Sequence, residues 1–161
     1  MKLTELIKER RQVKENKKLI KEFPFLLPRN RWSGQVDPNY DYTYTELDAM
    51  PYGWRKAFGL EMCKELKEEL IKCNYLNDYR ITDIKEKYGS LRWYDNGYPA
   101  SSKIAEIIYK YEMMSEDVCI NCGKAAKYVT KGYIEFVCED CKKYLIENNH
   151  YTEGSFTEIE E

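Results

Sequence analysis

Residues 119–141 read CINCGKAAKYVTKGYIEFVCEDC, and their four cysteines are spaced C-x2-C-x15-C-x2-C. Each Cys-x-x-Cys pair can supply two corners of a zinc tetrahedron, so the two pairs together can fill all four. The expected ligands are Cys119, Cys122, Cys138 and Cys141. Since no corner is left for water, the spacing predicts one structural Zn²⁺ per chain and argues against zinc-hydroxide chemistry.

The residues around these cysteines predict a small module. Gly123 suits the left-handed backbone needed just past the second ligand, and residues 126–137 alternate as a hairpin around Lys131-Gly132. Residues 139–149 read as a helix whose positive N-terminal end favours the thiolates. This order of knuckle, hairpin and helix predicts a treble-clef arrangement. We expect the tail after Asn148 to be frayed, and His150 to be a tail residue and not a ligand.

The helix before this module is preceded by a β-hairpin and by a longer amphipathic helix. Residues 54–73 carry an apolar stripe of Phe58, Met62, Leu66 and Leu70, with Cys63 and Cys73 expected as small buried residues beside it. The second helix, ending near Met114, should start at a Ser cap within 101–102. Its core stripe is formed by Ile104, Ile107, Ile108 and Tyr111.

The hairpin should span Tyr79 to Asp95, with Gly89-Ser90 as a two-residue type II′ turn. That turn would pair Tyr88 with Leu91 and Glu86 with Trp93. The expected buried face is Ile84, Glu86, Tyr88, Leu91 and Trp93, and the expected outer face is Asp83, Lys85, Lys87, Arg92 and Tyr94.

The N-terminal part begins with an expected helix over residues 2–22, with a narrow stripe of Leu6, Val13 and Ile20. An irregular, Pro-rich and aromatic segment follows, from Phe23 to Pro51, in which residues 40–44 could form a short strand with one aromatic face. The whole chain is therefore expected to be α+β. Its predicted parts are an N-terminal helix (1–22), an α-β-β-α core (23–114), a four-cysteine module (115–148) and an acidic tail (149–161).

Composition limits the classes of function. Charged residues make up 34% of the 161 residues, yet the net charge is −2, which argues against coating long nucleic acid. The charge is uneven: residues 1–31 carry +6 and residues 139–161 carry −5. The sequence offers neither a transmembrane stretch nor a secretory signal, so we expect a cytoplasmic protein, in which paired cysteines favour metal over disulfides.

Signals for catalysis are sparse. The chain has one histidine and lacks P-loop, GxGxxG and HExxH motifs. Glu86 on an apolar face could act as an acid or base, but a buried carboxylate paired with a nearby Lys or Arg is the favoured interpretation. We therefore expect binding and not catalysis.

Three basic and aromatic clusters predict anion binding, because Arg and Lys bind phosphate while Trp and Tyr stack on bases. They are Arg29, Arg31 and Trp32; Trp54 and Arg55, with Lys56; and Lys85, Lys87, Arg92 and Tyr94. In an acidic chain they favour a compact ligand such as a nucleotide, cyclic nucleotide or short oligonucleotide. A zinc-finger adaptor that binds a host protein through the basic first helix and the acidic tail is one alternative. A DNA- or RNA-binding regulator is another, and an enzyme acting on nucleotides is a third.

The chain also resembles a group of uncharacterised bacteriophage and prophage proteins. The resemblance lies in segments 23–32, 44–59 and 84–97 and in the Cys-x-x-Cys pairs, within residues 18–142. The hairpin sequence KYG-x-LRWY followed by the two pairs is its most specific part. The resemblance implies a phage protein in the host cytoplasm. By analogy of context, it implies an antagonist of host defence that sequesters a nucleotide signal.

Overall fold

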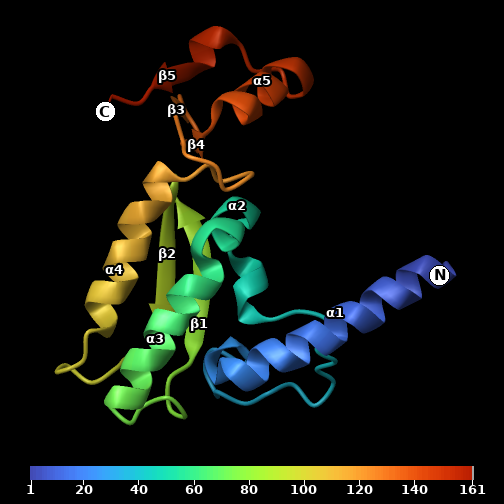
Figure 1. Ribbon diagram of the computed structural model, residues 1–161, viewed down its shortest axis with the longest axis vertical. Coiled ribbons are helices and arrows are strands. Elements are labelled where there is room, and N and C mark those ends of the chain that lie inside the picture. Colours follow the sequence, from blue (N-terminus) through green and yellow to red (C-terminus); the bar gives the residue numbers. More distant parts are fainter. Residues whose placement is uncertain (161) are drawn as a thin grey trace.

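A computed structural model describes residues 1–160 as a mixed α+β structure with helices and two small antiparallel sheets (Figure 1). The longer helices are α1 (Leu3–Glu22), α3 (Leu60–Lys72), α4 (Ile104–Met114) and α5 (Glu139–Asn148). The strands are β1 (Ile81–Lys87), β2 (Ser90–Asp95), β3 (Tyr128–Thr130), β4 (Phe136–Val137) and β5 (Phe156–Glu158). The short helix α2 (Tyr52–Trp54) continues into α3 through a π-helical segment, Arg55–Gly59.

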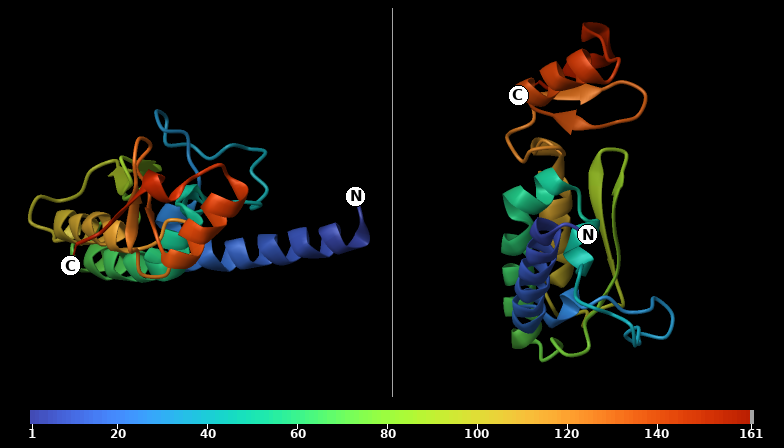
Figure 2. Two further views of the ribbon diagram at one scale, coloured as in Figure 1. Left: turned by 90° about the horizontal axis from the view of Figure 1, so that it is seen from above. Right: turned by 90° about the vertical axis from the view of Figure 1, so that its right-hand side faces the viewer.

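Helices α3 and α4 pack side by side on one face of the β1–β2 hairpin, as their apolar periodicity predicts (Figure 2). The predicted stripe of α3 is buried, and so are Ile104, Ile108 and Tyr111 of α4. Cys63 is fully buried as expected, whereas Cys73 is only partly buried at the end of α3. The expected Ser cap of α4 is wrong: Lys103 precedes the helix, and its N–H donates to Glu69 of α3.

The hairpin register differs from the predicted one. Lys87 pairs with Ser90 and Glu86 with Leu91, so the turn residues are Tyr88 and Gly89. Both have positive φ, 53° and 79°, as in a type I′ turn. Glu86 thus lies opposite Leu91, two residues before the predicted partner Trp93. A shift of two residues leaves the same side chains on each face, and Ile84, Leu91 and Trp93 are buried. Tyr88, however, is exposed at the turn and does not belong to the buried face.

The aromatic segment between α1 and α2 contains no strand, because Tyr42 adopts a positive φ of 64° that interrupts an extended backbone. The Tyr40 ring packs against the rings of Tyr42 and Tyr44, with distances of 4.8 and 5.3 Å between the ring centres. The first part of the segment closes the core with buried Phe23 and Phe25. The expected strand over residues 40–44 is therefore wrong.

The C-terminal module lies at the end of the long axis, beyond the hairpin turn (Figure 1). Its β3–β4 hairpin and α5 are formed as predicted. The expected frayed tail is wrong: β5 pairs with β3 and makes the order β4-β3-β5. Phe156 is buried against Tyr128 and Tyr151, which explains why the tail stays on the module.

Candidate metal centre and ligand-binding surface

Four cysteine sulfurs meet where the loop after α4 faces the start of α5. All four lie within 4.8 Å of one another, and the Sγ atoms of Cys122 and Cys138 are 3.5 Å apart. Sulfurs at the corners of a tetrahedron with bonds of about 2.3 Å would be about 3.8 Å apart. The cluster can therefore hold a metal ion.

The surroundings of the cluster suit bound thiolates. Cys138 is the N-cap of α5, and its sulfur accepts a hydrogen bond from the N–H of Cys141 at 3.4 Å. Burial and the neighbouring sulfurs raise the pKa of the Cys141 thiol, so the group ionises readily only when a cation compensates its charge. His150 is exposed and stands outside the cluster.

The module is joined to the core by close contacts. The turn residue Gly89 approaches Ile134 and Phe136, where an added Cβ would lie 2.9 Å from each side chain. Glu86 accepts hydrogen bonds of 2.7 Å from the Gly89 N–H and from the Tyr133 hydroxyl. Glu86 is therefore a bridge between hairpin and module, and its partners are not the Lys or Arg that the sequence suggested.

The outer face of the β1–β2 hairpin is left open by the helices (Figure 2). Lys85, Lys87 and Tyr94 are exposed on it, and Arg92 is partly exposed. The Lys85 ammonium lies 5.1 Å from the centre of the Tyr94 ring and 3.3 Å from the Asp83 carboxylate. This set of residues, Asp83, Lys85, Lys87, Arg92 and Tyr94, is called the outer face below.

The loop of residues 29–34 joins this surface. Arg31 lies 3.3 Å from the same Asp83 carboxylate that holds Lys85, so two of the three predicted clusters meet at Asp83. The Asn30 side chain accepts hydrogen bonds of 2.9 Å from the N–H groups of Trp32 and Ser33. These bonds fix the loop around Trp32, whose side chain is 87% exposed.

The third predicted cluster lies elsewhere. Trp54 is 0% exposed, and its Nε1 donates to the Val118 carbonyl at 3.3 Å, which is incompatible with stacking on a ligand. Arg55 is paired with Asp48, lies over the Tyr52 ring and lines a pocket together with residues of α1. Lys56 is exposed there as well. The three clusters do not converge on one site.

A carboxylate that the sequence gave no reason to single out lies beside the outer face. Burial, together with the nearby Asp83 charge, raises the pKa of Glu46 to about 6, although a backbone hydrogen bond from Arg29 opposes the shift. Glu46 belongs to the short 3₁₀ helix Glu46–Ala49, which packs on β1. No local pattern marks Glu46, because its neighbours come from distant parts of the chain.

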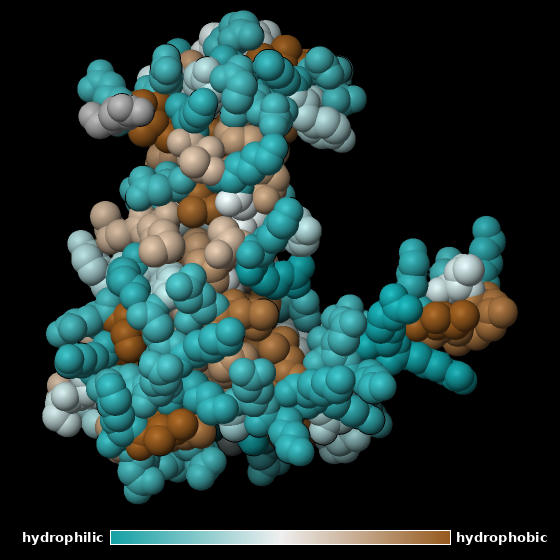
Figure 3. Space-filling model, viewed as in Figure 1, coloured by the Kyte–Doolittle hydropathy of each residue, from teal (hydrophilic) through white to brown (hydrophobic). Residues whose placement is uncertain are grey.

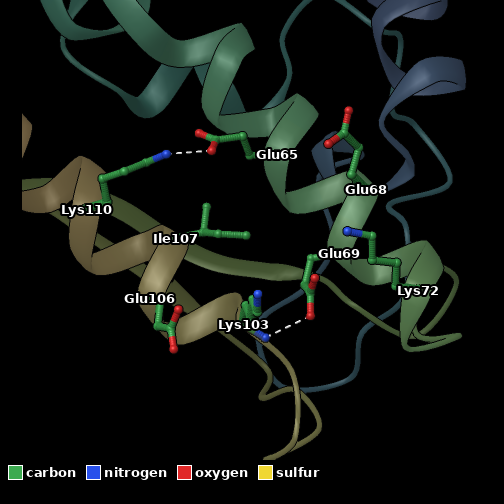
Figure 4. A pocket seen from close by; sticks show the side chains of 8 residues that line it. All are labelled: Glu65, Glu68, Glu69, Lys72, Lys103, Glu106, Ile107 and Lys110. Carbon is green, nitrogen blue, oxygen red and sulfur yellow. Dashed lines mark hydrogen bonds and ion pairs between the residues drawn. The ribbon is translucent and has the colours of Figure 1, made fainter.

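A groove between α3 and α4 is lined by acidic and basic side chains and by Ile107 (Figure 4). Glu65 is paired with Lys110 and accepts a hydrogen bond from Tyr111, while Glu69 caps α4. The contacts of Glu65 and Glu69 join the two helices across this groove.

No family model, no curated protein and no solved structure matches the chain. None of the helices within residues 1–160 combines the length and the apolar character that spanning a lipid bilayer requires.

Proposed function

We propose that the protein binds a nucleotide-like anionic ligand on the outer face of the hairpin. The observation that carries this proposal is the junction at Asp83, which joins Arg31 to a face that already presents Lys85, Lys87, Arg92 and Tyr94. Arg and Lys side chains would hold the phosphates, while Tyr94 and the exposed Trp32 offer rings for base stacking.

The charge of this surface favours a compact ligand. Arg31, Lys85, Lys87 and Arg92 against Asp83 give the surface a local charge of +3, whereas the whole chain carries −2. A long polyanion would also meet the acidic C-terminal module, which weakens binding of that class.

Calorimetry against a panel of mononucleotides, cyclic nucleotides and short oligonucleotides tests the proposal. We expect one or more to bind, and the double variant Lys85→Gln/Arg92→Gln to weaken binding. The matched control is Lys64→Gln, which removes an exposed charge from α3. Absence of binding at millimolar concentration, or equal weakening by the control, would reject the outer face as the site.

A second function, protein binding, is favoured by α1. Residues 1 to 12 are all exposed, and α1 projects away from the body (Figure 1). Apolar side chains gather near its free end, where Met1, Leu3 and Ile7 are more than half exposed (Figure 3). In this function the chain is an adaptor, and a pull-down that survives Arg92→Gln but is lost on deleting residues 1–10 would support it.

We also propose that the metal is zinc, that it is structural, and that the module is a treble clef. Four sulfur ligands favour zinc and leave no position for water. The order of knuckle, β3–β4 hairpin and α5 supports the treble-clef assignment. Metal analysis of the purified protein should give one zinc per chain, and any other stoichiometry would contradict this assignment.

A further inference from the structure

A second basic site lies under the loop of residues 29–34. A cavity of about 350 Å³ opens between this loop and the turn before β1, and Arg29, Gly34, Asn77, Asp78 and Arg80 line it. Its size falls at the low end of small-molecule sites, which span roughly 300–1,000 Å³.

Arg80 lines this cavity and has no ion-pair partner within residues 1–160. Its Nε is buried and has no hydrogen-bond partner among the described residues. Its guanidinium packs on Gly34, where an added Cβ would lie 1.7 Å from Nη1. The Arg80 backbone is fixed by Asn96, which accepts from its N–H at 2.9 Å and donates to its carbonyl at 3.1 Å.

Arg29 reaches the same cavity from the loop. Its Nη1 donates to the Gly34 carbonyl at 3.0 Å, which fixes the guanidinium beside the residue on which Arg80 packs. In residues 1–160, no carboxylate oxygen lies within 4.0 Å of either guanidinium. Asp78 is the one acidic side chain in the lining, so the cavity carries an excess of positive charge.

We propose that this cavity binds a phosphate group. The Arg80 Nε is closed off from solvent, so an oxyanion in the cavity would accept from the Nη groups of Arg29 and Arg80, which both line it. Two guanidinium groups offer more donors than a planar carboxylate can accept, whereas a phosphate presents three terminal oxygens to both. The phosphate can be free or part of a larger molecule.

This inference does not rest on the outer face. Within residues 1–160, Arg29 and Arg80 form no hydrogen bond with Lys85, Lys87 or Arg92, so either site can fail while the other holds. The two sites share only the loop of residues 29–34, through Arg29 on the cavity side and Arg31 on the outer face.

The test is a titration of the full chain with inorganic phosphate at constant ionic strength, followed by NMR of the arginine Nε–H signals. We expect the Arg80 signal to shift and saturate at millimolar phosphate, and acetate to bind more weakly. Arg80→Gln should weaken binding about tenfold or more, as expected for a lost charge-assisted hydrogen bond. Lys64→Gln, which removes an exposed charge from α3, should leave the affinity unchanged.

Each contrary result is decisive. An Arg80 signal that does not move in the wild-type protein overturns the proposal whatever the variants do. Equal or tighter binding of acetate overturns the assignment to phosphate. Unchanged phosphate affinity in a folded Arg80→Gln variant overturns the location.

Discussion

The backbone N–H of Gly53 donates a hydrogen bond of 2.9 Å to the carbonyl of Ile120, which ties the start of α2 to the cysteine knuckle. The two backbones touch so closely that a Cβ on Gly53 would lie 2.1 Å from the Cys119 carbonyl oxygen. Trp54, the next residue, hydrogen-bonds to Val118. The four-cysteine module is thus connected to the core by backbone contact as well as by the chain itself.

The first prediction concerns this contact. Gly53→Ala should destabilise the protein by about 2–4 kcal/mol, because neither backbone can move away without breaking the Gly53–Ile120 hydrogen bond. Urea unfolding measures the change. Gly154→Ala is the control, since its nearest contact would be an ordinary 3.8 Å, and it should be nearly neutral. Similar losses in both variants would show that the close approach is unimportant.

The second prediction concerns metal removal. Chelation should abolish amide protection in residues 119–158 while α3 and α4 keep theirs, because the module has few buried apolar side chains apart from those around the cysteines. Hydrogen exchange with mass spectrometry measures this directly. Protection that persists in β3 and α5 after complete metal loss would contradict a structural role for the ion.

The third prediction follows from the raised pKa of Glu46, about 6 against an ordinary 4.5. The folded state binds more protons than the unfolded state between these values, so the contribution of Glu46 to stability falls as pH rises through this window. At pH values above this window, the charged Glu46 carboxylate lowers the free energy of unfolding by less than about 2 kcal/mol, because its partial exposure to solvent screens the effect. Below it, both states are protonated and the cost vanishes.

Glu46→Gln removes this cost and can still accept the hydrogen bond from the Arg29 backbone. The variant should therefore be more stable than the wild type at about pH 8 and equally stable at about pH 4. Thermal unfolding at both pH values measures the difference. A stability change of the same size at both would mean that Glu46 ionisation is not the cause.

Sequence patterns predicted the parts of the structure that depend on local spacing. The cysteine pairs, the apolar stripes of α3 and α4 and the alternation of the hairpin are all read over a few residues. The hairpin register was missed because Tyr88, a bulky residue, occupies a left-handed conformation that its type disfavours. The third strand of the module was missed because Phe156 is held by Tyr128, which lies far away in sequence.

The candidate sites show the same limit. Arg31, Lys85 and Tyr94 were identifiable by residue type, but their meeting at Asp83 depends on how a loop crosses a distant strand. The burial of Trp54 could not be predicted either, because a Trp-Arg-Lys sequence at a helix start resembles an exposed anion site. The partner of the Trp54 side chain, the Val118 carbonyl, lies far away in sequence. Arg80 has no pattern of its own, and only its unpaired Nε marks it.

The fourth prediction concerns Asp83, which forms ion pairs with both Arg31 and Lys85. Asp83→Asn should increase the affinity for an anionic ligand of the outer face about fivefold, because it removes one negative charge beside the phosphates. Calorimetry measures the affinity. Asp140→Asn is the matched control, because it frees Lys124 on the module and should leave binding unchanged. Weaker binding in Asp83→Asn would place the ligand elsewhere.

The last prediction separates the two halves of α1. Deleting residues 1–10 should change the free energy of unfolding by less than about 0.5 kcal/mol, because all of these side chains are exposed. Asn16, in contrast, is buried, and its side-chain amide donates to the Tyr42 carbonyl at 2.8 Å. Asn16→Ala should cost about 1–2 kcal/mol, because the Tyr42 carbonyl loses its donor. Thermal unfolding of both variants measures the contrast. A larger loss of stability in the deletion than in Asn16→Ala would show that residues 1–10 contribute to the fold. That result would contradict the proposal that the free end of α1 is a binding surface for a partner.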